Sequence, residues 1–244
     1  MNQCNEKITG RIHSFQSLGT VDGPGVRSVI FMQGCPLRCA CCHNPDTWDF
    51  SGGEEKSTEE LVSKVLRYKT YYGQNGGVTV SGGEPLMQAD FLTDLFKKLK
   101  NYGVHTALDT SGCVLNGDVR ELLGYTDLVL LDFKYTNRED YLKYTKMEID
   151  AALDFLQYLE EIKKPTWIRF VVIPSINDDE NTIEDICSLK MKYACVEKIE
   201  FLPFRKLCLE KYDEMGIEFP LKHIPEAKQS FIDDIYEKYE EALS

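Results

Sequence analysis

The sequence predicts one α/β domain whose central sheet is mainly parallel, and three observations support this prediction. Apolar runs alternate six times with segments of helical periodicity, the pattern of repeated strand–helix units. The run at 128–133 is apolar throughout except for Asp132, as expected for a parallel strand covered on both faces. The chain has 244 residues, one to two times a typical domain length, and no shift in composition divides it.

Each predicted strand is a run of β-branched, aliphatic or aromatic residues bounded by polar or turn residues. In chain order the six runs are residues 26–33, 78–80, 104–108, 128–133, 167–173 and 198–202. A closed barrel of this type needs eight strand–helix units. Six units therefore indicate either an incomplete barrel or an open doubly wound sheet.

The helices between these strands are predicted from capping signals and from apolar residues three and four positions apart. Ser57 and Glu60 form a capping box, which starts a helix with Leu61 and Val65 on one face. Further helices are predicted at 91–99, ending at Gly103, around 149–162, at 183–193 and in the amphipathic stretch after Pro225.

We expect these elements to form a single domain that spans 1–244. An amino-terminal hairpin at about 8–25 precedes a core at about 26–205, and a carboxyl-terminal flap and helix follow at about 206–244. Within the flap, residues 207–227 have the least regular pattern.

Charge and hydropathy exclude several classes of partner. The chain carries 28 Lys and Arg against 40 Asp and Glu, a net charge of −12 with a sequence pI near 4.9. Binding to nucleic acid or to anionic membranes needs a surplus of basic residues, so we expect neither. No stretch approaches the ~18 apolar residues of a membrane span, and the first seven residues lack the apolar core of a signal peptide. We therefore expect a cytoplasmic protein.

Cysteine usage points to metal chemistry. The chain has nine cysteines, an odd number, which argues against a disulfide framework. Cys35, Cys39, Cys41 and Cys42 lie within eight positions, with the spacing Cys-x3-Cys-x2-Cys for the first, second and fourth. Three thiolates in so short a loop suit an iron–sulfur cluster with one iron left without a protein ligand. The alternative is zinc, held by the same three with Cys41 or His43 as the fourth ligand.

Polar residues follow five of the predicted strands, at the point where each strand ends. These segments are residues 35–42, 81–85, 109–110, 132–134 and 203–205. The carboxyl ends of parallel strands meet at one edge of a sheet, where ligand sites are built. The sequence therefore predicts one active-site rim at this edge.

At this level of detail the chain resembles the radical S-adenosylmethionine (SAM) superfamily, and within it the family that activates glycyl radical enzymes. The resemblance rests on the cysteine spacing, on Gly82-Gly83-Glu84 after the second strand, and on segments in the same order along the chain. These are TVDGPGVR at 20–27, QGC at 33–35, CHN at 42–44, DTW at 46–48, LDFK at 131–134 and WIRFVV at 167–172. The similarity runs from Gly10 to about Ala227.

The resemblance implies a partial (β/α)6 barrel and a defined reaction. A [4Fe-4S] cluster on Cys35, Cys39 and Cys42 would bind SAM and cleave it reductively to a 5′-deoxyadenosyl radical. That radical would abstract hydrogen from a glycine of a partner enzyme, so no side chain is assigned as catalytic. Pyruvate formate-lyase is the expected partner, because no further cysteine set is inserted between Cys42 and Gly82. The alternatives are another glycyl radical enzyme, a small-molecule substrate, or a zinc-stabilised binding module.

The same resemblance implies an external one-electron donor, flavodoxin or ferredoxin, and a monomeric enzyme. It also assigns contacts to individual positions. The residues expected to contact the cofactor are Cys41, His43, Gly82, Gly83, Glu84, Asp132, Phe133, Lys134 and Arg205. The residues expected to bind a monovalent cation, sodium or potassium, are Asp109, Thr110, Leu130 and Asp132. The residues expected to contact the partner enzyme are Asp22, Gly23, Pro24 and Gly25. The chain departs from the family at Cys41, usually aromatic, and at Arg205, often histidine.

Arg169 lies within an otherwise apolar strand. A buried arginine needs an anionic partner. From the residues alone, that partner is either a cofactor or substrate group or a structural carboxylate.

Overall fold

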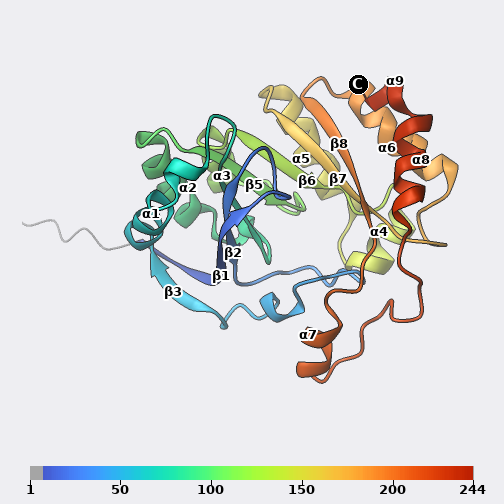
Figure 1. Cartoon of the computed structure of the whole chain (residues 1–244), viewed down its shortest axis with the longest axis horizontal. Coiled ribbons are helices and arrows are strands. Elements are labelled where there is room, and N and C mark those ends of the chain that lie inside the picture. Colours follow the sequence, from blue (N-terminus) through green and yellow to red (C-terminus); the bar gives the residue numbers. More distant parts are fainter. Residues whose placement is uncertain (1–7, 244) are drawn as a thin grey trace, which may run out of the picture.

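The computed structural model describes residues 8–243; residues 1–7, where the sequence predicts no signal peptide, and Ser244 lie outside the described residues. One eight-stranded sheet forms the centre of the molecule (Figure 1). Its strands are β1 (Thr9–Gly19), β2 (Arg27–Met32), β3 (Glu54–Ser57), β4 (Gly77–Gly82), β5 (His105–Thr110), β6 (Leu128–Asp132), β7 (Thr166–Val172) and β8 (Val196–Pro203).

The six predicted strands form the parallel part of this sheet. They are β2, β4, β5, β6, β7 and β8, and they lie side by side in chain order. A doubly wound sheet would reverse its strand order part-way. The constant direction seen here is that of a (β/α) barrel, and β8 ends one edge of the sheet while β3 ends the other. The prediction of a partial (β/α)6 barrel is therefore confirmed.

Two antiparallel strands extend the sheet beyond β2. β1 pairs with β2, and β3 pairs with β1. The segment at about 8–25, expected to form a hairpin, contributes the single strand β1, whose partner β2 is the first strand of the expected core. The sequence did not predict β3, because Glu54, Glu55 and Lys56 are charged and largely exposed. A short charged strand at a sheet edge discourages pairing with another molecule.

The helices, apart from the short one at residues 209–214 that lies beyond the strand tips, cover the outside of the curved sheet (Figure 1). They are α1 (Thr58–Leu66), α2 (Ala89–Asn101), α3 (Gly117–Gly124), α4 (Arg138–Thr145), α5 (Ile149–Glu161), α6 (Glu180–Lys192), α7 (Leu209–Glu214), α8 (Gln229–Lys238) and α9 (Glu240–Leu243). The predicted capping box of α1 is present: the Ser57 hydroxyl accepts from the Glu60 amide, and the Glu60 carboxylate accepts from the Ser57 amide. The main core forms between these helices and the outward-facing residues of the strands.

The inner face of the sheet changes character along the strands. Near the amino ends, Ala107, Leu128, Leu130 and Trp167 form a small apolar cluster of their own. Side chains alternate between faces along a strand, so Asp109, Asp132 and Arg169 occupy the same inner face two positions further on. The lumen of the barrel is thus apolar near the amino ends and polar near the carboxyl ends.

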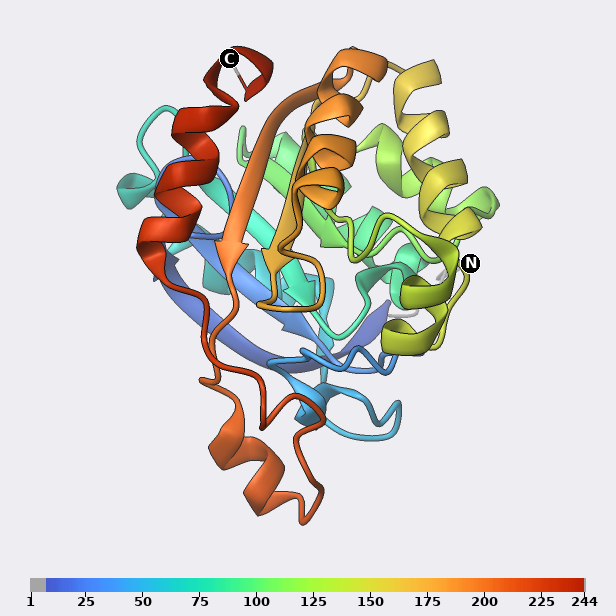
Figure 2. The same cartoon turned by 90° about the vertical axis from the view of Figure 1, so that its right-hand side faces the viewer.

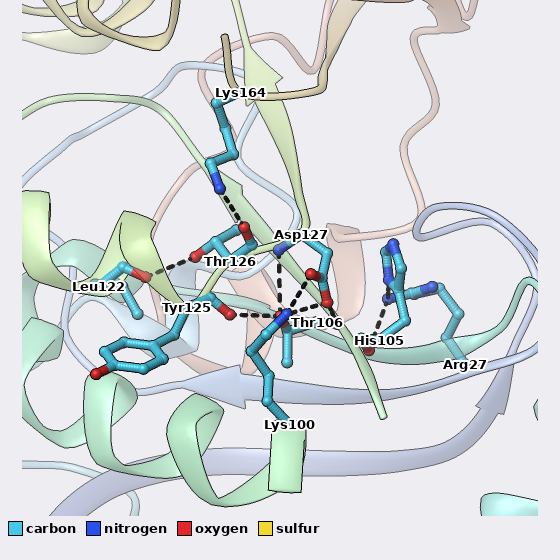
Figure 3. A network of polar contacts seen from close by, with 9 residues as sticks. All are labelled: Arg27, Lys100, His105, Thr106, Leu122, Tyr125, Thr126, Asp127 and Lys164. Atoms are coloured by element: carbon cyan, nitrogen blue, oxygen red, sulfur yellow. Dashed lines mark hydrogen bonds and ion pairs between the residues drawn. The ribbon is translucent and has the colours of Figure 1, made fainter. Parts of the chain in front are cut away.

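A polar network closes the amino ends of the strands (Figure 3). The Asp127 carboxylate accepts from the Thr106 amide at 3.0 Å and pairs with Lys100. Lys164 donates to the Thr126 carbonyl, and Arg27 contacts His105 Nδ1 at 3.1 Å. These groups bond to one another and thereby fix the start of β5, β6 and β7.

At the carboxyl ends, two segments far apart in sequence lie beyond the strands. The loop that follows β2 and the segment around α7 both extend past the strand tips (Figure 2). In the described part of the chain, no helix combines the length and apolar character needed to cross a membrane.

Candidate functional site

A cavity of about 320 Å³ lies at the carboxyl ends of the parallel strands. It is lined by most of the residues that the sequence assigned to a site. These are Asp22, Cys35, Cys39, Cys41, Cys42, His43, Gly82, Gly83, Glu84, Asp109, Thr110, Asp132 and Lys134. The predicted active-site rim therefore exists as one continuous surface.

Some assigned residues do not line this cavity. Phe133 is buried in the main core, and Leu130 belongs to the inner apolar cluster. Arg205 donates to the Ala227 carbonyl, and its own carbonyl accepts from His43 Nε2 at 2.8 Å. Gly23, Pro24 and Gly25 lie behind Asp22, the one residue of that segment in the lining.

The lining also contains residues that the sequence did not assign to the site. Phe31 and Val171 are residues of β2 and β7, and Leu202 lies near the end of β8; Ser81 and Pro203, which belong to the predicted rim, line the cavity as well. Phe31, Val171 and Leu202 are apolar residues of strands that the sequence did predict, and nothing in their residue type marks them as site residues.

The four clustered cysteines face the cavity and are half-buried. Burial raises the pKa of Cys35 to about 12 and that of Cys41 to about 11, and it also raises the pKa of Cys39 and Cys42. The ammonium of Lys134 acts in the opposite direction but does not offset the burial. Without a metal these thiols stay protonated at neutral pH, whereas bound metal would supply the positive charge that thiolates need.

The three spaced cysteines line one cavity. Three thiolates that share a cavity suit an iron–sulfur cluster with one iron left without a protein ligand, whereas a closed zinc site needs a fourth ligand. Within residues 8–243, no group of three His, Cys, Asp or Glu side chains is arranged to hold a single metal ion.

Glycines bring the loop after β4 against the cysteine loop. A Cβ on Gly83 would lie 2.4 Å from the Gly34 carbonyl oxygen, and one on Gly82 would lie 2.3 Å from the Met32 amide nitrogen. Gly82 also has a φ of +109°, a conformation that other residues rarely adopt. The two glycines are thus required for the close packing that places their backbone at the cavity.

The Glu84 carboxylate ties this loop to β5. One oxygen accepts from the Thr110 hydroxyl at 2.6 Å, and the other accepts from the Ser111 amide at 3.0 Å and from the Ser111 hydroxyl. Glu84 is almost fully buried. Its side chain therefore holds two walls of the cavity together.

Two charged groups at the end of β6 point into the cavity. Lys134 Nζ lies 2.5 Å from Asp132 Oδ2. Burial alone would lower the pKa of Lys134, but Asp132, Cys39 and Cys41 together raise it well above its ordinary value. Lys134 therefore presents a permanent positive charge between the cysteines and the carboxylate.

Arg169 has structural carboxylates as its partners. Its Nη1 lies 3.2 Å from Asp109 Oδ2, and its Nε lies 3.7 Å from Glu200 Oε2. Asp109 Oδ2 also accepts from the Ser81 hydroxyl at 2.7 Å. In the described part of the chain, however, Asp109 Oδ1 is buried and receives no hydrogen bond. Burial outweighs the attraction of Arg169 and raises the pKa of Asp109 to about 7.

Arg27 holds the segment that carries Asp22. Its guanidinium is fully buried and donates to the Pro24 carbonyl at 3.1 Å and to the Thr79 hydroxyl at 2.7 Å. The Thr79 hydroxyl in turn donates to the Asp22 carbonyl at 2.6 Å. This chain of bonds fixes the turn at 22–25 and presents the Asp22 side chain to the cavity.

The fold and this site define a class of protein: the radical SAM superfamily, whose family model matches residues 29–186. Within that superfamily, the chain belongs to the family of pyruvate formate-lyase-activating enzymes. It is 44% identical over 218 residues to the pyruvate formate-lyase-activating enzyme of Clostridium pasteurianum, covering 89% of this chain and 91% of that protein. It is 42% identical over 231 residues to the pyruvate formate-lyase 1-activating enzyme of Escherichia coli K12, covering 93% and 94%.

Solved structures share the fold at low sequence identity. A domain of pyruvate-formate lyase-activating enzyme from Bacteroides vulgatus superposes with a TM-score of 0.57 at 22% identity, covering 69% of this chain and 95% of that chain. Streptococcus suis SuiB bound to precursor peptide SuiA superposes with a TM-score of 0.64 at 13% identity, covering 87% of this chain and 46% of that chain. These likenesses establish the fold alone.

Proposed function

We propose that this chain is a radical SAM activase that generates a glycyl radical on pyruvate formate-lyase. The observation that carries the proposal is the shared cavity, in which three spaced thiols, the Gly82–Gly83 backbone and the charges of Asp132 and Lys134 face one another. Family membership identifies the chemistry for which such a cavity is built.

Cys35, Cys39 and Cys42 would hold a [4Fe-4S] cluster. When bound, cluster and SAM supply a one-electron cleavage that gives methionine and a 5′-deoxyadenosyl radical, which takes a hydrogen atom from glycine. The chain positions these groups and excludes water from them. Lys134 offers a cation to the carboxylate or ribose of SAM, and the backbone of Gly82 and Gly83 offers carbonyl acceptors to its amino group.

The remaining contacts follow from the family resemblance, and only some of these residues line the cavity. Cys41 and His43 line it and would contact SAM. Phe133 and Arg205 lie outside the lining, with Arg205 bonded to His43 through its carbonyl, and are proposed as further cofactor contacts. The unpartnered Asp109 Oδ1 suits a hard monovalent cation. Thr110, Leu130 and Asp132 are the other proposed ligands of that cation.

The partner's glycine would enter beside Asp22. Because Arg27 and Thr79 hold the turn at 22–25 in place, Gly23, Pro24 and Gly25 form a preformed edge for a backbone to contact. An external flavodoxin or ferredoxin would supply the electron, and the reaction would take place in the cytoplasm.

The test uses reconstituted, oxygen-free protein mixed with pyruvate formate-lyase, SAM and a reductant. We expect a glycyl radical signal in electron paramagnetic resonance (EPR) spectra and cleavage of the partner on exposure to oxygen. SAM cleavage without a partner radical would instead indicate a small-molecule substrate. A radical on a different glycyl radical enzyme alone would reassign the partner.

A further inference from the structure

A basic groove of about 510 Å³ lies on the outer side of the cysteine loop. We call it the loop groove and define it by Arg38, Ala40, Lys143, Lys146 and His223. Among the described residues that line it, none is Asp or Glu. The lining of the loop groove is therefore basic, although the chain as a whole has a net charge of −12.

The cysteine loop itself is the wall between the loop groove and the site cavity. Leu37, Cys39 and Cys41 line the cavity, whereas Arg38 and Ala40 line the groove. Residues 37, 39 and 41 of this short loop thus line one side and residues 38 and 40 the other. A partner in the groove would be separated from the cysteines by a single thickness of backbone.

Contacts within the protein hold this wall against the groove. The Ala40 amide donates to the Tyr144 carbonyl at 2.7 Å, and the Arg38 amide donates to the Thr145 carbonyl at 2.9 Å. Tyr144 lines the groove and stacks on Tyr135, with ring centroids 5.1 Å apart. Tyr135 is buried, and the nearby thiols of Cys41 and Cys39, together with burial, raise its pKa. The groove floor and the cysteines are therefore joined by packed protein.

Two lysines of α2 are already ion-paired. Lys98 is paired with Asp94 and Glu59, and Lys100 is paired with Asp127. Paired lysines contribute little net positive potential, whereas Lys143 and Lys146 are exposed in a groove without lining carboxylates. The carboxylates of Asp140 and Glu139, which act on Lys143, lie outside that lining. Unbalanced charge of one sign steers a partner of the opposite sign.

We infer that the loop groove docks an acidic one-electron carrier protein, which passes its electron through the wall formed by the cysteine loop. This inference rests on the proposed function, since only a redox site needs such a partner. The carrier would lose one electron and the site would gain one, with no atom transferred. The glycyl partner would use the cavity side, so the two partners would approach opposite faces of the same loop.

The experiment measures binding of oxidised flavodoxin to the anaerobic, reconstituted protein by titration calorimetry at low salt. The groove variant is Lys143→Glu/Lys146→Glu. Its matched control is Lys97→Glu/Lys163→Glu, which makes the same change in net charge. Lys97 is an exposed helical lysine, as Lys143 is. Lys163 is an exposed lysine with a positive φ of 52°, and it matches Lys146, whose φ is 65°. We expect the groove variant to bind about tenfold or more weakly and the control to change by about twofold or less.

Affinity that weakens equally in both variants, or in neither, would overturn the inference, as would failure of the unaltered chain to bind flavodoxin. The milder Lys143→Gln/Lys146→Gln variant should also weaken binding, by a smaller factor. It replaces the Glu variant in the test if the Glu variant loses iron or unfolds at a lower temperature than the unaltered chain. Radical formation by the unaltered chain with dithionite tests the proposed function without any carrier. A radical formed with dithionite, together with unchanged flavodoxin binding in the groove variants, would overturn the docking site alone.

Discussion

The two ends of the parallel strands use similar side chains in different ways. At the amino ends, Arg27, His105 and Asp127 bond to neighbouring protein groups (Figure 3). At the carboxyl ends, Asp109 Oδ1 and Arg169 Nε are buried without a hydrogen-bond partner in the described part of the chain. Buried polar atoms are normally paired. A ligand bound at the carboxyl ends would supply hydrogen-bond partners for these atoms.

This difference separates structural from functional polar residues. A cluster whose bonds are all made within the protein stabilises the fold, and losing a member leaves its partners unsatisfied. A cluster with buried polar atoms that lack hydrogen bonds is less stable on its own, and a bound ligand that supplies those bonds would stabilise it. Substitutions at the amino ends should therefore reduce stability, whereas substitutions at the carboxyl ends should reduce ligand binding.

The largest effect is expected in the cysteine loop. Cys35→Ala, Cys39→Ala or Cys42→Ala should each abolish iron binding, because a cluster with two protein thiolates is not held. Cys41→Ala is the matched control and should retain most of its iron. Iron and sulfide analysis after anaerobic reconstitution measures this, and equal iron loss in the Cys41 variant would show that the ligands are misassigned.

Arg27→Met should cause the largest loss of stability outside that loop. The substitution leaves the Val78 and Pro24 carbonyls and the Thr79 hydroxyl without their donor, so we expect a loss of about 2 to 4 kcal/mol in the free energy of unfolding. Urea unfolding measures it. Arg120→Met removes an exposed arginine that stacks on Tyr158 and should cost about 1 kcal/mol or less. Similar losses in both variants would contradict the role of Arg27.

At the carboxyl end, Asp109→Asn should stabilise the metal-free chain at alkaline pH. Burial raises the pKa of Asp109 from 3.8 to about 7, so the native state binds the extra proton between these values. Stability therefore falls as pH rises from about 4 to about 7. The variant lacks this fall and should exceed the parent by about 4 kcal/mol at pH 8 while matching it near pH 4. Parallel stability–pH curves would contradict the expectation.

The same variant sharpens the cation proposal. If Asp109 helps to bind a monovalent cation beside SAM, potassium should tighten SAM binding to the parent chain but not to Asp109→Asn. Equilibrium binding of SAM to reconstituted protein, with and without potassium, measures this. An equal potassium effect in both would remove Asp109 from the cation site.

The smallest effect is expected at His105. Burial and the Arg27 guanidinium lower the pKa of His105 below 6.5, so the unfolded chain binds more protons and stability is lost as pH falls below that value. His105→Gln should reduce this loss between pH 6.5 and 5, as measured by urea unfolding at both pH values. His223→Gln changes an exposed histidine and should leave the slope unchanged. A slope that is the same in His105→Gln and the parent chain would contradict the expectation.

The sequence could predict the parallel core because its strands are buried on both faces and therefore read as continuous apolar runs, as at 128–133. It could not predict β3, whose charged residues pair only because β1 supplies an edge. Nor could it predict α4, a polar helix whose carboxyl end is held by backbone bonds to Arg38 and Ala40. Such elements are determined by tertiary contacts rather than by their own periodicity.

The candidate site divides in the same way. The cysteine spacing, the polar strand ends and the family resemblance together assigned the thirteen residues that line one cavity. The partners of Arg169 depend on how four neighbouring strands, β5 to β8, are aligned, and a single sequence does not specify that register. The loop groove joins three segments that lie far apart in the chain, at Arg38, at Lys143 and Lys146, and at His223, so only the folded structure reveals it.

Low-temperature EPR of the reduced, anaerobically reconstituted chain, recorded with and without SAM, tests most directly whether three thiolates hold an iron–sulfur cluster open to SAM. We predict about four iron and four sulfide per chain and a cluster signal whose shape changes when SAM is added. A signal indifferent to SAM, or a colourless chain that contains zinc and no iron, would contradict the account.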